Sequence, residues 1–228
     1  MTRHVLPGDP PVEVTLRRSA RARRISLRVS GIDGRVTLTL PRGASEREAL
    51  EFAQEKAGWL RRHLDKRVAD VAVGIGAELP FRGGLRVVVP GQGRAVRLGE
   101  GEIAVPGDPG RVGARLLGYL KESARARLAE ASDRYAGALG RDYARLTLRD
   151  TRSRWGSCSA EGGLMYSWRL IMAPDDVLDY VAAHEVAHLA EMNHSTRFWR
   201  QVERLYGNYT PPRTWLRDNG AELHRYRF

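Results

Sequence analysis

Hydrophobic and polar residues alternate in two stretches near the start of the sequence, as they do in β-strands with one buried face. The alternation runs through residues 12–29 and again through residues 35–40. Gly31-Ile32-Asp33-Gly34 separates the last two alternating stretches and has the composition of a tight turn. This part of the chain is therefore predicted to contain a β-hairpin.

Two longer stretches change to the three- and four-residue spacing of a helix. The first begins at Ser45, which forms a capping box with Glu48, and its apolar stripe extends to about Asp70. The second runs from Val112 to about Leu139. Residues 71–110 are rich in Gly and Pro and contain short β-prone pieces, so they are predicted to form a small sheet with turns.

The last third of the chain combines short strands with a helix that carries histidines. Strands are predicted at Leu146–Leu148 and Gly163–Ile171, and a helix from about Asp176 to about Ala190. His184 and His188 continue the apolar stripe of this helix. Both imidazoles are therefore predicted to point toward the interior.

These elements predict an α+β fold in two regions. Residues 1–110 form a β-rich N-terminal region with one helix, and residues 111–228 form a second region that contains the helix with the histidines. With 228 residues, the chain is long enough to bury a sizeable core, and we expect the two regions to pack as one unit.

The candidate chemistry lies in His184-Glu185-Val186-Ala187-His188, a His-Glu-x-x-His motif. Helical residues four apart have Cβ atoms about 5–6 Å apart, so both imidazoles can bind one zinc ion at about 2.0–2.1 Å. Glu185 projects beside the metal, where it can take a proton from zinc-bound water and deliver it to a leaving amine. The alternative is a pair of histidines packed in the core, with Glu185 on a surface face.

A catalytic zinc normally has three protein ligands and a water, so the motif needs a third partner. His194 is the candidate, provided that the helix ends before it, because a continuing helix would turn its side chain about 240° away. Asn193 tolerates the left-handed conformation that often ends helices and is predicted to help here. The remaining histidines are predicted to be ordinary surface or packing residues: His4, His63 and His224.

Further motifs follow one another in a fixed order around this site. They are Ser153-Arg154-Trp155-Gly156-Ser157-Cys158-Ser159, Trp168-Arg169-Leu170-Ile171, Pro174, Tyr180-Val181, His184-Glu185-x-x-His188 and Asn193-His194-Ser195-x-x-Phe198-Trp199. With this order the chain resembles the YgjP-like metal-dependent hydrolases, which are close to the SprT-like zinc metallopeptidases. The resemblance is dense over about residues 145–217, and Ser167 departs from it where asparagine is expected.

The resemblance implies a zincin-like domain in which His184, His188 and His194 hold zinc and Glu185 is the catalytic acid/base. The predicted function is a zinc metallopeptidase that cleaves peptide bonds of a peptide or protein substrate. In zincins a strand near the metal receives an extended peptide through backbone hydrogen bonds. Gly163–Ile171 is predicted to be that strand because it lies so close to the helix in the sequence.

Cys158 is the single cysteine, so the chain has no internal disulfide, and a reducing cytoplasm is expected. If its thiolate were a fourth zinc ligand, no coordination position would be left for a water, and the metal would be structural. The paired ligands of closed Cys-His sites are absent, and the histidines that could activate a nucleophilic thiol are better explained as zinc ligands. We expect neither membrane insertion nor a secretory signal, since the chain has no long apolar run.

Charge suggests a rival function. The formal net charge is +11, and residues 1–70 carry 15 basic and 9 acidic residues, against 13 and 11 in residues 141–228. The rival is a nucleic-acid or acidic-partner binding protein with a structural zinc. Weak, nonspecific and salt-dependent binding to nucleic acid would use Arg17, Arg18, Arg21, Arg23, Arg24 and Arg28, which otherwise form a solvated strand face.

Overall fold

The computed structural model describes residues 2–31, 33–65 and 69–228. The chain divides into two compact units, Met1–Ala69 and Asp70–Phe228, here called the N-terminal and C-terminal units. The boundary predicted at residue 110 therefore lies inside the C-terminal unit. Helices and sheets occur in both units, which confirms the predicted α+β class.

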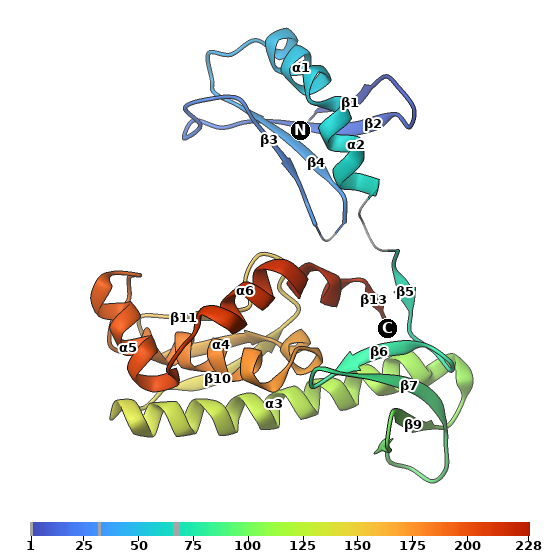
Figure 1. The fold of residues 1–228 in the computed structure, drawn as a ribbon, viewed down its shortest axis with the longest axis vertical. Helices are drawn as coiled ribbons and strands as arrows, with labels where there is room; N and C mark the ends of the chain where they lie inside the picture. The colour runs from blue at the N-terminus through green and yellow to red at the C-terminus, as the bar shows by residue number, and fades with distance from the viewer. Residues whose placement is uncertain (1, 32, 66–68) are drawn as a thin grey trace. The chain divides into compact units, whose positions relative to one another are not determined.

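The N-terminal unit is a four-stranded sheet with two helices over it (Figure 1). Its elements are β1 (Thr2–Leu6), β2 (Val12–Arg18), β3 (Ser26–Val29), β4 (Val36–Leu40), α1 (Glu46–Glu55) and α2 (Ala57–Asp65). The strand order is β1-β2-β4-β3, and β3 and β4 are antiparallel, which confirms the predicted hairpin. In the predicted turn, Ile32 lies outside the described residues.

The helical stretch after the hairpin is two helices and not one. Ser45 caps α1 by accepting a hydrogen bond from the Glu48 backbone N–H at 3.1 Å, as its position predicted. The chain leaves helical geometry at Lys56, the C-cap of α1, and α2 begins at the next residue. The break lets both helices bury small and apolar residues on the sheet, among them Ala53 and Leu60. The predicted extension to Asp70 passes through residues 66–68, which lie outside the described residues.

The C-terminal unit begins with the short sheet predicted for residues 71–110. The elements of this segment are β5 (Val71–Ala72), β6 (Glu78–Phe81), β7 (Gly84–Gly91), β8 (Arg97–Leu98), β9 (Glu102–Pro106) and the 3-10 turn η1 (Pro109–Arg111). The sheet itself has the strand order β6-β7-β9-β8, and β5 is not part of it. The long helix α3 spans Val112–Leu139, as predicted, and Gly140 ends it with a φ of 70°. A glycine suits this left-handed position because it has no Cβ to clash with the backbone.

The remaining elements form a second sheet and the helices around it. They are β10 (Arg145–Arg149), β11 (Gly156–Cys158), β12 (Gly163–Ser167), η2 (Trp168–Met172), α4 (Asp175–Ala187), α5 (Thr196–Tyr206), α6 (Thr210–Asn219), η3 (Gly220–His224) and β13 (Tyr226–Arg227). β13 pairs with β5, so the C-terminal end of the chain joins the start of this unit.

The second sheet differs from its prediction in two ways. The predicted strand Gly163–Ile171 ends at Ser167, because the next five residues turn into the buried 3-10 helix η2. In addition, the segment predicted only to separate two strands contains a third strand, β11. The order is β10-β12-β11, with β10 parallel and β11 antiparallel to β12, so β11 lies at an edge.

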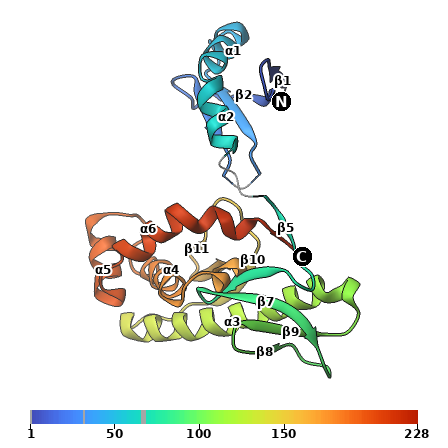
Figure 2. The ribbon, with the colours of Figure 1, turned by 45° about the vertical axis from the view of Figure 1, so that its right-hand side comes forward.

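Helix α4 lies between α3 and α6 in both views (Figure 1 and Figure 2). It also contacts α5 and β11, and it buries residues on all sides, including Leu178, Ala182 and Val186. The single inward stripe predicted for this helix is therefore too narrow a description. No described helix combines the length and the apolar character that a membrane span requires.

Candidate metal centre

Three imidazoles meet at the C-terminal end of α4. His184 and His188 come from the helix, and His194 comes from the turn that precedes α5. One nitrogen from each lies within 4.8 Å of the others, and the Nε2 atoms of His184 and His194 are 3.1 Å apart. The structure thus brings together the three histidines that the sequence singled out.

The chain reverses direction between the second and third histidines. Helix α4 ends at Ala187, so His194 returns toward the first two, as the predicted geometry required. Asn193 does not adopt the left-handed conformation predicted for it, since Arg82 is the one non-glycine residue with positive φ among those described. Its side-chain oxygen instead accepts a hydrogen bond from the Ser195 backbone N–H at 3.1 Å. A turn closed by the Asn193 side chain therefore takes the place of the predicted left-handed backbone conformation.

Phe198 packs against all three imidazoles. Its ring centroid lies 4.3 Å from that of His188 and 4.8 Å from those of His184 and His194. The Phe198 backbone N–H donates to the Ser195 side chain at the start of α5, which sets the position of the ring. The imidazoles are therefore held by packing as well as by the helix.

The histidines offer free lone pairs to a cation. His188 Nδ1 lies 2.9 Å from the Glu191 carbonyl oxygen, and an N–H donated there leaves Nε2 as an acceptor. Burial lowers the pKa of His184 to about 3 and also lowers the pKa of His188, which keeps both imidazoles neutral.

The nitrogen spacing also fits a metal ion. Nitrogens around a tetrahedral zinc ion, each at about 2.0–2.1 Å, lie about 3.4 Å from one another. The 3.1 Å between His184 and His194 Nε2 is close to this spacing. Three imidazoles without a carboxylate among them suit a borderline ion such as zinc better than Mg²⁺ or Ca²⁺, which prefer oxygen ligands.

Glu185 lies beside this cluster in a buried position, with 6% of its surface exposed. Burial raises the pKa of its carboxyl to about 8, and the positive charge of Arg154 opposes the rise. Gly156 on β11 lies against it so closely that an added Cβ would come 2.5 Å from Glu185 Oε1. The strand therefore needs glycine here to leave room for the carboxylate.

A small pocket of about 240 Å³ opens in front of Glu185 and His184. The other residues that line it come from β11 and the loop before it, from α4 and from α6: Arg154, Trp155, Gly156, Tyr180, Val181 and Leu216. A carboxyl and a candidate metal ligand thus face one cavity. Such an arrangement suits the attack of water on a polar bond that is held in the pocket.

The comparison with known protein families decides the identity. Residues 23–219 match the model of the YgjP-like metallopeptidase domain. The chain belongs to the YgjP-like family. This confirms the resemblance predicted from the motifs and makes the protein a metallopeptidase, a hydrolase that acts on a peptide or protein substrate.

Other comparisons add less. The metallopeptidase zymogen of Pyrococcus abyssi abylysin, known from a crystal structure, is similar at 19% identity and a TM-score of 0.37. The match covers 44% of this chain and 99% of that one. A search of curated proteins found no match. The family assignment therefore rests on the match to the YgjP-like domain.

The remaining candidates are not part of the three-histidine group. Cys158, on β11, is not part of that group, and its Sγ–H donates to the Ser159 carbonyl at 3.4 Å. Burial, together with the nearby charge of Glu185, raises the pKa of the Cys158 thiol to about 11, which disfavours the thiolate. His4 is on β1, and His63 on α2 contacts the Trp59 carbonyl.

His224 is the third of these histidines and is a packing residue. It is buried, and its ring centroid lies 5.3 Å from that of Trp155. Beside it, the buried Arg169 binds Asp150 at 2.6 and 3.1 Å and donates to the Leu223 carbonyl at 2.7 Å. These contacts attach the C-terminal segment to the sheet that carries β11.

Sequence reasoning missed two residues beside Glu185. The first is Arg154, whose charge acts on the carboxyl, and the second is Gly156, whose missing side chain makes room for it. Both lie between the two predicted strands, in a segment for which no strand was predicted. The Trp155-Gly156 pair was the available signal, because a glycine within a strand often marks a close approach.

Proposed function

We propose that the protein is a zinc-dependent peptidase in which His184, His188 and His194 are the metal ligands and Glu185 is the general acid/base. The convergence of three imidazole nitrogens within 4.8 Å supports this proposal most strongly. The buried carboxyl of Glu185, beside the imidazoles and facing the same pocket, supplies the second requirement.

A bound zinc ion would supply Lewis acidity, which lowers the pKa of a water ligand and polarises the scissile carbonyl. Glu185 would take a proton from the attacking water at its carboxylate oxygen and then donate it to the leaving amine. Its pKa of about 8 in the buried site leaves a carboxyl that can hold a proton at neutral pH between these two transfers. The cation would lower that value by favouring the carboxylate.

We propose that the edge of β11 aligns the substrate. β12, the strand predicted for this role, is paired on both sides and has no free edge, so that prediction is wrong. Trp155 and Ser159 use their backbone groups to bond to the β12 side. Because antiparallel bonding alternates along a strand, the N–H and C=O groups of Gly156 and Cys158 face the open edge. An extended peptide can pair there, next to Glu185.

Metal analysis of the purified protein tests the ligand assignment. We expect about one zinc ion per chain in the wild type and less than a tenth of that in His188→Ala, because the remaining pair cannot complete the site. His63→Ala removes a histidine from the N-terminal unit and should retain the wild-type zinc content. Zinc retained in His188→Ala, or lost equally from both variants, would contradict the assignment.

Binding of nucleic acid by the N-terminal unit is a second candidate activity. The six arginines predicted for it are exposed, and Arg18 is tied to the Arg42 and Ala44 carbonyls and to Glu46. The others form no side-chain hydrogen bond or ion pair among the described residues and can reach a polyanion: Arg17, Arg21, Arg23, Arg24 and Arg28. Weak, salt-sensitive retention on immobilised polyanion would support this activity. The cytoplasmic location of the protein stays a prediction.

A further inference from the structure

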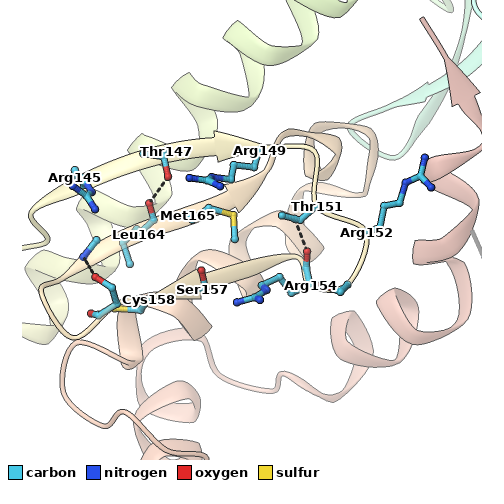
Figure 3. Close-up of a pocket in the computed structure, with 13 residues that line it drawn as sticks. Arg145, Thr147, Arg149, Thr151, Arg152, Arg154, Ser157, Cys158, Leu164 and Met165 are labelled. Atoms are coloured by element: carbon cyan, nitrogen blue, oxygen red, sulfur yellow. Dashed lines mark hydrogen bonds between the residues drawn. The ribbon is translucent and has the colours of Figure 1, made fainter. Parts of the chain in front are cut away.

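A basic groove lies on the outer face of the β10-β12-β11 sheet (Figure 3). Its volume is about 810 Å³. Four arginines line it, and none of the described lining residues is acidic: Arg145, Arg149, Arg152 and Arg154. The proposed catalytic roles do not account for this groove.

Strand register explains how the charges gather on one face. Arg145, Thr147 and Arg149 alternate along β10 and therefore point to the same side. The register places Thr147 opposite Met165, and Met165 opposite Ser157, so this face continues across all three strands. The intervening residues of β10, Leu146 and Leu148, pack against the core on the other face.

Two of the four arginines have the most accessible charge. Arg149 and Arg154 are exposed, and neither guanidinium forms an ion pair among the described residues. Both side chains reach over the sheet in Figure 3, toward Met165 and Ser157. Arg145 lies near Glu161 at one end of the groove, and Arg152 extends away from the other three.

The groove adjoins the pocket of the metal centre. Arg154 lines both cavities, and the strand between them is β11. A peptide paired to the open edge of β11 would place alternate side chains on the two faces of the extended sheet. Those on the outer face would lie beside Ser157 and Arg154, and the groove continues from there across β12 to Arg149 on β10.

We propose that this groove binds acidic side chains of the substrate, so that the enzyme prefers peptides with Asp or Glu at alternate positions near the scissile bond. This inference rests on the proposed function, because the adjoining pocket is where the peptide is cut. Guanidinium groups match carboxylates in shape and charge and bind them through two parallel hydrogen bonds. Each exposed pair adds about two- to fivefold in affinity, so two pairs give about tenfold.

Peptide binding measured without turnover tests the preference. The protein is the full-length, zinc-loaded Glu185→Gln variant, and the probes are three fluorescent peptides that differ only in carrying Glu, Gln or Lys at alternate positions. We expect the Glu peptide to bind about tenfold more tightly than the Gln peptide at low salt, and the Lys peptide to bind most weakly. Equal affinities would overturn the proposal.

Arginine variants locate the effect. In the same background, Arg149→Gln should reduce the preference for Glu over Gln about threefold. Arg94→Gln is the matched control, because Arg94 is also exposed in the C-terminal unit but lies outside the groove lining. A preference unchanged in Arg149→Gln, or reduced equally in Arg94→Gln, would contradict the groove as its source.

Turnover of the same peptides by the wild type separates this inference from the proposed function. Hydrolysis without preference for the Glu peptide would overturn the groove alone. Selective binding without any hydrolysis by the zinc-loaded wild type would overturn the proposed peptidase chemistry. A single-stranded oligonucleotide that binds more tightly than the Glu peptide, and loses affinity in Arg149→Gln, would assign the groove to nucleic acid and overturn the proposal.

Discussion

The metal centre and the basic groove lie on either side of β11, but they are built in opposite ways. His184, His188 and His194 are close in sequence and packed against Phe198, and burial lowers the pKa values of His184 and His188. The groove instead collects exposed, charged residues from β10, from the following loop and from the face of β11. A partly buried histidine site and an open, charged groove therefore share a single strand.

This difference shows which sites can be read from spacing along a chain. A helix sets the distance between two histidines four residues apart, so the motif by itself implies a metal site. The groove has no such local rule. Residues 141–228 contain 13 basic and 11 acidic residues, and this near balance conceals a sheet face lined by four arginines. Strand alternation and pairing, and not composition, concentrate the charge.

The largest difference between the two regions should appear on removing the Glu185 carboxylate. Glu185→Gln cannot exchange protons with water, so we expect kcat to fall about 10²- to 10⁴-fold while zinc content stays at the wild-type level. Arg149→Gln should lower kcat/KM for the acidic peptide only several-fold. Peptide cleavage and metal analysis on the same preparations provide the check. Wild-type turnover in Glu185→Gln would refute the assigned role.

Chelation should separate the two regions by chemistry. Prolonged treatment with a strong chelator at neutral pH is expected to reduce peptide cleavage to below about 5%, and added zinc to restore it, because the imidazoles supply the ligands. Preference for the acidic peptide in a binding assay should survive, since no groove arginine is a proposed ligand. Activity that resists chelation would mean that these histidines do not hold the catalytic metal.

Acid should lower the stability of the folded protein through His224, which packs against Trp155. Burial lowers the pKa of His224 from 6.5 to about 4, so between these values the unfolded chain binds a proton that the folded chain does not. Its contribution to stability is complete above pH 6.5 and is lost as the pH falls toward 4, by about 3 kcal/mol at most.

Urea unfolding at pH 7 and pH 5 measures this contribution. His224→Phe keeps an aromatic ring against Trp155 but has no titrating group, so its stability should fall less between the two pH values than that of the wild type. The proposed metal ligands are present in both proteins and therefore cancel from the comparison. Equal losses in the two proteins would exclude His224 as the source.

Salt should affect the groove and leave the metal centre nearly unchanged. Exposed charges are screened at high ionic strength, so the preference for the Glu over the Gln peptide should drop from about tenfold at 20 mM salt to about twofold at 500 mM. Cleavage of the Gln peptide should change less than twofold over the same range. A salt-independent preference would indicate that recognition does not depend on the open arginines.

The smallest effect is expected from the arginines of the N-terminal unit. Replacing Arg21, Arg23 and Arg24 by Gln should change cleavage of the acidic peptide less than twofold, because none of them lines either cavity of the C-terminal unit. Retention on immobilised polyanion should shift to lower salt in the same variant. A large loss of cleavage would show that basic residues outside the groove also select the substrate.

The sequence alone predicted the features that neighbouring residues determine. The cap at Ser45, the bounds of α3 and the β3-β4 hairpin depend on interactions between nearby residues, and each is present in the structure. The His-Glu-x-x-His spacing belongs to the same class, because one helical turn sets the distance between its imidazoles. Family membership followed from the order of such motifs.

Tertiary structure decided what depends on distant partners. A strand ends where its neighbours end, so nothing local showed that β12 stops at Ser167 or that both of its edges are paired. β11 has only three residues, too few for a clear alternation, and it is a strand because β12 pairs with it. The packing of α4 against β11 places Gly156 at the Glu185 carboxylate, and strand register places the arginines on the opposite face. The candidate metal ligands are close together in the sequence. The surface that would select the substrate, in contrast, exists only after the sheet has formed.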